Sequence, residues 1–225
     1  MFPRVVVNCK VYPQVTGLAV QKLAALCQGV ADEGGVEIGL APPAVELAAL
    51  ARSDQFPSLQ FFAQHVDPLI PGSGTGGVTV EGALGAGAQG TILNHAERKL
   101  DRAILQATVA RCVAEKLPTM LCADSLQETK FLASLHPTAI AIEPPELIGG
   151  TVSVTSANPT IVSDGVAAVQ SASPKTLTYC GAGVKTGQDV EAALALGAYG
   201  VLLASGVVCA DDPADALRNL IAGLA

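Results

Sequence analysis

The feature that most constrains this chain is a short apolar run that occurs eight times, each followed by a longer segment. Successive runs lie on average about 28 residues apart, close to the roughly 30 residues of a strand–helix–strand unit. The runs cover residues 5–9, 36–41, 59–64, 90–94, 119–123, 139–143, 176–181 and 199–204. Because they are almost continuously hydrophobic, they predict parallel strands that are covered on both faces.

The segments between the runs have the spacing of amphipathic helices. Apolar residues recur every three or four positions in two clear examples, Leu18, Leu23, Ala24, Leu26 and Val30, and Ile104, Leu105, Thr108, Val109 and Val113. Eight alternating strands and helices predict an α/β fold, a (β/α)8 TIM barrel that forms a single domain over residues 1–225. An open doubly wound sheet is the alternative, but its dinucleotide motif GxGxxG is absent after the first run.

The chain carries an excess of acidic residues, which bears on whether it binds nucleic acid or small anions. Thirteen Lys and Arg residues against twenty Asp and Glu residues give a formal net charge of −7. The chain contains no basic run, so we expect no nucleic-acid partner. An acidic protein does not attract an anion over a long distance, so any phosphate group must be held by local groups.

The cysteines and the N-terminus indicate a cytoplasmic protein. The six cysteines form no CxxC pair and no cluster with zinc spacing, which predicts reduced thiols that act as small core residues and no metal site. We expect no signal peptide, because the first apolar run leads directly into Asn8 and Lys10. Residues 192–210 carry no charge, but glycines interrupt them. We expect a helix end, a turn, a buried strand and a loop there, and no membrane contact.

Polar residues lie at the ends of several predicted strands, where barrel enzymes carry their chemistry. Asn8 and Lys10 are two positions apart at the end of the first run and therefore share a face. Gln64 ends the third run, His95 follows the fourth and Glu143 ends the sixth. Glycine-containing turns suited to phosphate follow the last two runs, at 181–183 and 204–206.

Each of these residues has an ordinary structural explanation when it is taken alone. A strand-end lysine is usually solvated, a histidine such as His95 often caps a turn, and Glu143 could cap the next segment. Glycines 181 and 183 could form a tight turn and nothing more. Their occurrence together at one rim favours a functional site. His65 and His136 fit structural or exposed positions, with His136 held in a loop by Pro137.

The same residues lie in segments that resemble the triosephosphate isomerase family, in its short archaeal form. The segments are NCK (8–10), FAQHVDP (62–68), PGSGTGG (71–77), NHAERK (94–99), IEPPELIGG (142–150), CGAGV (180–184) and GVLLASGV (200–207). They extend over nearly the whole chain, and their order and spacing are specific.

The resemblance implies a role for each matching residue. Glu143 would be the catalytic base, His95 the electrophile, Lys10 and Asn8 the pair that polarises and positions substrate, and Glu97 the acid that organises the site beside Lys10. The implied phosphate-binding residues are Ile148, Gly149, Gly181, Gly183, Ala204 and Ser205, with residues 144–150 as a mobile lid. Triosephosphate isomerase is itself a well-known worked example of this acid–base pairing and lid, so these roles are borrowed from the family.

The implied reaction interconverts dihydroxyacetone phosphate and D-glyceraldehyde 3-phosphate by proton transfer through an enediolate, a step of glycolysis and gluconeogenesis. It implies a small phosphorylated triose as substrate and no metal or organic cofactor. The loop 71–77 resembles the family's subunit-contact loop, which implies a homo-oligomer, either a dimer or a tetramer.

Two other functions fit parts of the pattern. Another phosphate-sugar barrel enzyme, such as an epimerase or a lyase, would share the phosphate turns but not Lys10, His95 and Glu143 in this order. A catalytically silent homologue that serves as a binding or scaffold protein would not need these three residues intact.

Two departures from the family's usual sequence carry expectations of their own. Ala96 stands where the family has a serine that holds the resting glutamate, so we expect Glu143 to lie nearer its catalytic position or to be spread over several rotamers. The order Gly150-Thr151 predicts a looser hinge at the end of the lid.

Overall fold

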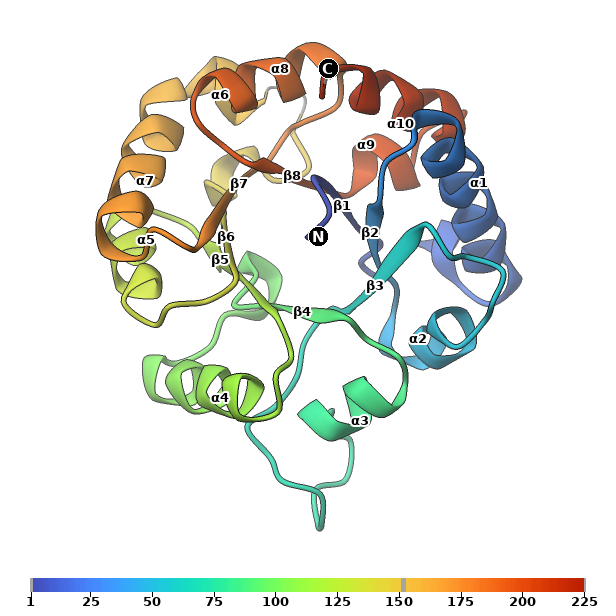
Figure 1. The fold of residues 1–225 in the computed structure, drawn as a ribbon, viewed down its shortest axis with the longest axis vertical. Helices are drawn as coiled ribbons and strands as arrows, with labels where there is room; N and C mark the ends of the chain where they lie inside the picture. The colour runs from blue at the N-terminus through green and yellow to red at the C-terminus, as the bar shows by residue number, and fades with distance from the viewer. Residues whose placement is uncertain (1, 151–152, 225) are drawn as a thin grey trace.

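The structure is a computed structural model that describes residues 2–150 and 153–224. Eight parallel strands close into a barrel in sequence order, and helices surround it (Figure 1). The strands are β1 (Val5–Asn8), β2 (Ile38–Ala41), β3 (Leu59–Ala63), β4 (Gly90–Leu93), β5 (Thr119–Ala123), β6 (Ala139–Ile142), β7 (Leu177–Gly181) and β8 (Gly200–Leu203). Each strand lies within a predicted run, which confirms the (β/α)8 TIM barrel.

Closure of the sheet excludes the open-sheet alternative. β1 pairs with β2 on one side and with β8 on the other, with Val5 opposite Val201 and Val7 opposite Leu203. A doubly wound sheet would leave two free edges, whereas here the first and last strands complete each other's hydrogen bonding.

Helices and short helical turns connect the strands. They are η1 (Pro13–Val15), α1 (Leu18–Gly34), α2 (Ala44–Ala51), α3 (Val80–Gly85), η2 (Ala96–Arg98), α4 (Arg102–Ala114), α5 (Leu126–Ala133), η3 (Pro145–Leu147), α6 (Val154–Ala157), α7 (Pro159–Ala172), α8 (Gly187–Ala195), α9 (Ser205–Val208) and α10 (Pro213–Ala222). α1 and α4 confirm the two helices predicted from apolar spacing. The loop predicted after residue 204 was wrong, because α9 forms there and buries Val207 and Val208 in the core.

Two apolar layers fix the direction of the strand side chains. The barrel interior contains Val6, Phe62, Met120, Tyr179 and Leu202, among others, while the alternate strand residues face the helices. Ala139 and Ala141 also belong to the interior layer. Glu143 continues their alternation, as Asn8 continues that of Val6, so both side chains are directed to the interior at the carboxyl ends of the strands.

The opposite, N-terminal end of the barrel is closed by aromatic rings. The rings of Phe2 and Phe62 lie 5.2 Å apart, and those of Tyr179 and Tyr199 lie 5.7 Å apart. The Tyr179 hydroxyl donates to the Pro3 carbonyl at 2.5 Å, and the Tyr199 hydroxyl donates to the Phe2 carbonyl at 2.8 Å. We call this end the aromatic floor; the hydroxyls of Tyr179 and Tyr199 are both hydrogen-bonded there.

The cysteines are free thiols, and five of the six are buried as predicted. Cys209, which follows α9, is exposed, so its expected core position was wrong. Burial raises the pKa of the Cys27 thiol to about 12 and that of the Cys180 thiol to about 12. Among the described helices, none combines the length and the apolar character that a membrane crossing requires.

Candidate active site

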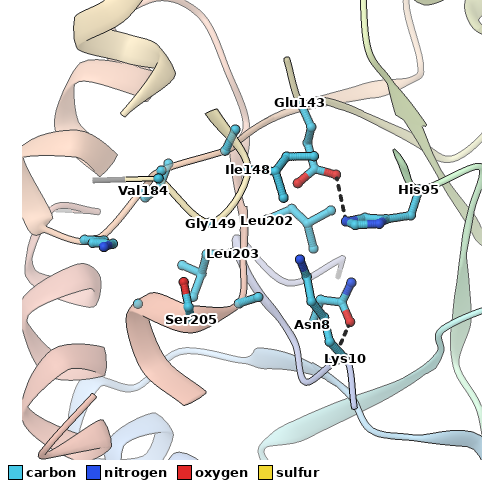
Figure 2. Close-up of a pocket in the computed structure, with 16 residues that line it drawn as sticks. Asn8, Lys10, His95, Glu143, Ile148, Gly149, Val184, Leu202, Leu203 and Ser205 are labelled. Atoms are coloured by element: carbon cyan, nitrogen blue, oxygen red, sulfur yellow. Dashed lines mark hydrogen bonds and ion pairs between the residues drawn. The ribbon is translucent and has the colours of Figure 1, made fainter. Parts of the chain in front are cut away.

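A cleft opens at the carboxyl ends of the strands, and it contains all but two of the predicted site residues. Glu143, His95, Lys10 and Asn8 lie on one side of it, and Gly149, Val184 and Ser205 lie across from them (Figure 2). The complete lining is Asn8, Lys10, His95, Glu143, Ile148, Gly149, Gly150, Ala182, Gly183, Val184, Lys185, Leu202, Leu203, Ala204, Ser205 and Gly206. Glu97 and Gly181 do not line it.

Glu143 follows β6 and is placed by its own backbone. Its N–H donates to the Ala123 carbonyl at 2.8 Å, which continues the pairing of β6 with β5. The side chain is only 7% exposed, and its Oε2 lies 3.8 Å from His95 Nε2, too far for a hydrogen bond. Among the described residues, Oε2 has no hydrogen-bond partner. Burial raises the pKa of this carboxyl, while the charge of His95, a hydrogen bond from the Cys122 thiol and the charge of Lys10 oppose the rise. The group is therefore an under-solvated carboxylate, as a proton acceptor requires.

Gly181, predicted to bind phosphate, lies next to Glu143 and does not itself line the cleft. It is the buried last residue of β7, and a Cβ atom there would lie 2.6 Å from Cγ and 2.7 Å from Oε1 of Glu143. Only a residue without a side chain leaves this space. Gly181 thus makes room for the carboxylate, a requirement that depends on contact between two strands and cannot be read from the turn sequence.

His95 is oriented by the turn that follows it. Its Nδ1 accepts a hydrogen bond from the Glu97 backbone N–H at 3.1 Å, which begins the turn η2. A nitrogen that accepts this bond carries no proton, so the proton lies on Nε2, the atom that faces Glu143. The ring, only 8% exposed, can therefore donate from Nε2 as a neutral imidazole.

Lys10 is held in a left-handed conformation at the end of β1, with φ of 50°. Its N–H donates to Asn8 Oδ1 at 3.0 Å, and its carbonyl accepts from Gln64 Nε2 at 2.9 Å. The ammonium donates to Glu97 Oε1 at 2.7 Å, the contact that the resemblance implied for Glu97. Gln64 was noted only as a strand-end residue; the structure adds that it fixes the backbone of Lys10.

The loop that carries His95 is anchored through the residue before it. Asn94 has φ of 61° and is buried. Its amide donates to the Cys122 carbonyl and to Glu128 Oε1, both at 2.9 Å, and its Oδ1 accepts from the Leu100 N–H at 3.1 Å. These bonds tie both ends of the loop to β5 and α5, which explains how a loop residue such as His95 keeps a fixed direction.

The far side of the cleft is formed by backbone. Gly149, Ala182 and Gly183 all have φ between 72° and 74°, a region in which glycine is favoured. Among the described residues, the N–H groups of Gly149 and Gly183 donate to no other residue. Successive backbone N–H groups in such turns form anion-binding concavities. This side of the cleft can therefore accept an anionic group without a basic side chain.

Residues 144–150, the predicted lid, border the cleft through their last three residues. They contain η3 and end in a turn in which the Gly150 N–H donates to the Leu147 carbonyl at 3.0 Å. Ile148, Gly149 and Gly150 line the cleft. Thr151, on which the expected looser hinge depends, lies outside the described residues.

The other histidines lie outside this cleft. His65 is buried and contacts Asp67 at 3.0 Å. His136 is exposed in the segment after α5, with Nδ1 3.2 Å from the Ser173 hydroxyl. Within residues 2–150 and 153–224, no group of three His, Cys, Asp or Glu side chains is arranged to hold a metal ion.

Comparison with known proteins gives the family. The model of the family described as triosephosphate isomerase matches residues 3–222. The chain belongs to the triosephosphate isomerase family. It is 44% identical to the triosephosphate isomerase of Methanopyrus kandleri, over 99% of this chain and 98% of that protein. Identity to the triosephosphate isomerase of Methanocaldococcus jannaschii is 40%, over 96% of this chain and 98% of the relative.

A third triosephosphate isomerase, from Methanothermobacter thermautotrophicus, is 39% identical over 97% of this chain and 94% of its own length. The similarity to all three relatives thus extends over the full barrel, including both sides of the cleft. The segments in which the resemblance was noted from sequence all fall within the matched residues.

Proposed function

We propose that this chain is an intramolecular aldose–ketose isomerase that interconverts dihydroxyacetone phosphate and D-glyceraldehyde 3-phosphate. One observation carries the proposal: a buried carboxylate, Glu143, faces the Nε2 atom of His95 at 3.8 Å in a cleft whose opposite side is anion-binding backbone. The arrangement supports proton abstraction at one end of a small substrate and phosphate binding at the other.

Glu143 would remove a proton from the carbon next to the substrate carbonyl. Its Oε2 accepts no hydrogen bond from a described residue and would take the proton, and the same carboxyl would then return it to the neighbouring carbon. General-base catalysis of this kind contributes about 10²–10⁴-fold in rate. The raised pKa brings the carboxyl closer to the pH at which it must both accept and release a proton.

The enediolate that forms after proton removal carries negative charge on its oxygens. The Nε2–H of His95 can donate to these oxygens, and the Lys10 ammonium can stabilise the charge electrostatically. The ion pair with Glu97 keeps the Lys10 ammonium at the mouth of the cleft. Asn8, through its bond to the Lys10 N–H, would position the substrate and the lysine together.

The phosphate group would bind to the backbone side of the cleft, at Gly149, Gly183, Ala204 and Ser205, with Ile148 covering it. The lid at 144–150 would exclude water during the reaction. Backbone N–H groups can hold a dianion although the chain as a whole is acidic.

A coupled assay in both directions, on purified protein without added metal, tests this function. Glu143→Gln should lower kcat by about 10²–10⁴-fold and leave the binding of inorganic phosphate nearly unchanged. Glu191→Gln, an exposed glutamate on α8, is the matched control and should behave as the parent. Turnover of a phosphorylated sugar other than the two trioses would favour an epimerase or lyase. Absence of any turnover would favour a silent homologue.

We also propose that the chain forms a homo-oligomer through the loop 71–77. This loop projects from the barrel between β3 and α3 (Figure 1), and the neighbouring Ile70 is 68% exposed. A second cleft beside Lys10, lined by His65 and Arg98 among others, has a volume of about 160 Å³ and could receive this loop from another copy. Light scattering should give a dimer or tetramer that Ile70→Asp weakens, and a parent that is monomeric at micromolar concentration would refute the proposal.

The free cysteines support a cytoplasmic location, which we propose with the same function. Fractionation of the source cells, with the chain followed by an antibody, would test it.

A further inference from the structure

One charged residue of the cleft has no part in the proposed mechanism. Lys185 lies in the loop after β7 and lines the cleft beside Gly183 and Ser205. A Cβ atom at Gly206 would lie 3.3 Å from Lys185 Cγ and 3.4 Å from Lys185 Cα. The stem of the lysine therefore packs against the chain next to Ser205, on the backbone side of the cleft. Figure 2 shows that side in the positions of Val184 and Ser205, across from Glu143 and His95.

Lys185 differs from the other lysine of the cleft in having no ion-pair partner among the described residues. Lys10 and Lys185 are the two cations that line it, and Glu143 is the anion. The Lys10 ammonium is already paired with Glu97 at 2.7 Å. The Lys185 ammonium has no hydrogen bond or ion pair with any residue in the described ranges. Lys185 thus lines the backbone side of the cleft, where the phosphate group is proposed to bind, and its charge is not neutralised by a described residue.

The backbone of Lys185 is fixed although its ammonium is free. Its N–H donates to Asp189 Oδ2 at 3.0 Å, and the same oxygen accepts from the N–H and the hydroxyl of Thr186, both at 2.9 Å. These bonds form part of the capping box that begins α8. Because this Asp189 oxygen already accepts three hydrogen bonds, the nearest acid along the chain is committed to holding the loop.

We propose that Lys185 is a specificity-determining residue whose ammonium binds the phosphate group of the substrate, in addition to the backbone N–H groups. The inference rests on the proposed function and names a side chain for the phosphate end of that site. Its effect is on binding, because the phosphate does not change charge during the proton transfer. A charge-assisted hydrogen bond at a half-exposed position corresponds to about a 5- to 20-fold change in affinity.

The test compares Lys185→Met with Lys185→Arg. Lys185→Met keeps the apolar stem against Gly206 and removes the charge. We expect KM for glyceraldehyde 3-phosphate to rise by about 5- to 20-fold, with kcat within about twofold of the parent. Lys185→Arg should restore most of the affinity. The difference between parent and Lys185→Met should shrink as ionic strength rises, since salt screens a partly exposed charge.

Lys175→Met is the control, because Lys175 is exposed and lies before β7, at the opposite end of the strand. Calorimetric titration with inorganic phosphate separates the two proposals: the phosphate affinity of the parent should exceed that of Lys185→Met, and this comparison needs no turnover. A parent that does not isomerise triose phosphates refutes the proposed function alone. Equal phosphate affinity and equal KM in a folded Lys185→Met, or a loss confined to kcat, overturns the role of Lys185.

Discussion

The two ends of the barrel differ in whether their polar side-chain atoms have hydrogen-bond partners. At the aromatic floor, Tyr179 and Tyr199 each donate to a backbone carbonyl. Arg4 also donates to the carbonyls of Tyr199 and Leu224. At the carboxyl ends of the strands, a buried carboxylate oxygen of Glu143 has no partner. An unpaired buried polar atom costs free energy, and a ligand bound beside Glu143 would supply the missing hydrogen-bond partner.

The backbone conformation also differs between the two ends of the barrel. Three residues other than glycine at the functional rim, Lys10, Asn94 and Ala182, have positive φ. Lys116 and His136 also have positive φ, but they follow the ends of α4 and α5, where a left-handed residue is ordinary. Strain of about 1–3 kcal/mol per residue persists only where surrounding bonds enforce it. The bonds from Gln64 to Lys10 and from Asn94 to its neighbours do so here.

The largest expected effect comes from filling the space beside Glu143. Gly181→Ala places a methyl group within 3 Å of Cγ, Cδ and Oε1 of that residue and must displace the carboxylate. A displacement of about 1 Å can cost about 10²-fold in rate, so we expect kcat to fall by that order. Gly85→Ala, on α3 with open space around it, is the control. A kcat for Gly181→Ala within about threefold of the parent would show that Glu143 tolerates movement.

The second prediction concerns the floor. Tyr179→Phe removes the hydroxyl that donates to Pro3 and leaves a carbonyl unpaired, which costs about 1–3 kcal/mol. For a chain of this length the melting temperature should fall by about 2–12 °C, with kcat and KM unchanged. Calorimetry and the coupled assay would measure both. A loss of activity at 25 °C in the folded variant would show that the floor and the cleft are not independent.

The third prediction is that the functional rim lowers stability. A carboxyl whose pKa is raised by burial binds its proton more tightly when folded than when unfolded, so stability falls as pH rises from the usual value of 4.5 through the raised value. The Glu143→Gln variant has no carboxyl at this position, so it does not lose stability in this way as pH rises. Its melting temperature at pH 7 should exceed that of the parent by at least about 2 °C, and the difference should disappear below pH 4. An equal or lower melting temperature at pH 7 would contradict a net cost of the buried carboxylate.

The smallest effect is expected at Ala96, which follows His95 and has no hydroxyl. Ala96→Ser should give the resting Glu143 a hydrogen-bond donor and sharpen a position away from the imidazole. Because such a bond stabilises the resting state and not the transition state, kcat should not rise. Ligand-free crystal structures of parent and variant would test this. The idea fails if the parent already holds Glu143 in one ordered position at the backbone near residue 96 and serine changes nothing.

The sequence predicts the barrel well because its signals are local and repeat. The runs at 139–143 and 199–204 locate β6 and β8 to within a residue or two, and alternation places Glu143 on the interior face. The roles of Gly181 and Gln64 depend on atoms from neighbouring strands, which no local pattern contains. α9 was missed because four residues are too few to show a helical period. Lys185 carried a signal that went unused: a basic residue two positions after Gly183, the last residue of a glycine turn suited to phosphate.

The seam between β1 and β8 has a consequence for how the protein is made. Arg4 and Tyr199, which meet across it, are 195 residues apart along the chain. During synthesis, the edge of β1 that pairs with β8 in the finished barrel stays unpaired until β8 has left the ribosome. Lys10 and Ser205 lie on opposite sides of this seam, so the cleft does not exist in any shorter nascent chain. Substrate can therefore bind and stabilise only the completed barrel, and it cannot influence the earlier steps of folding.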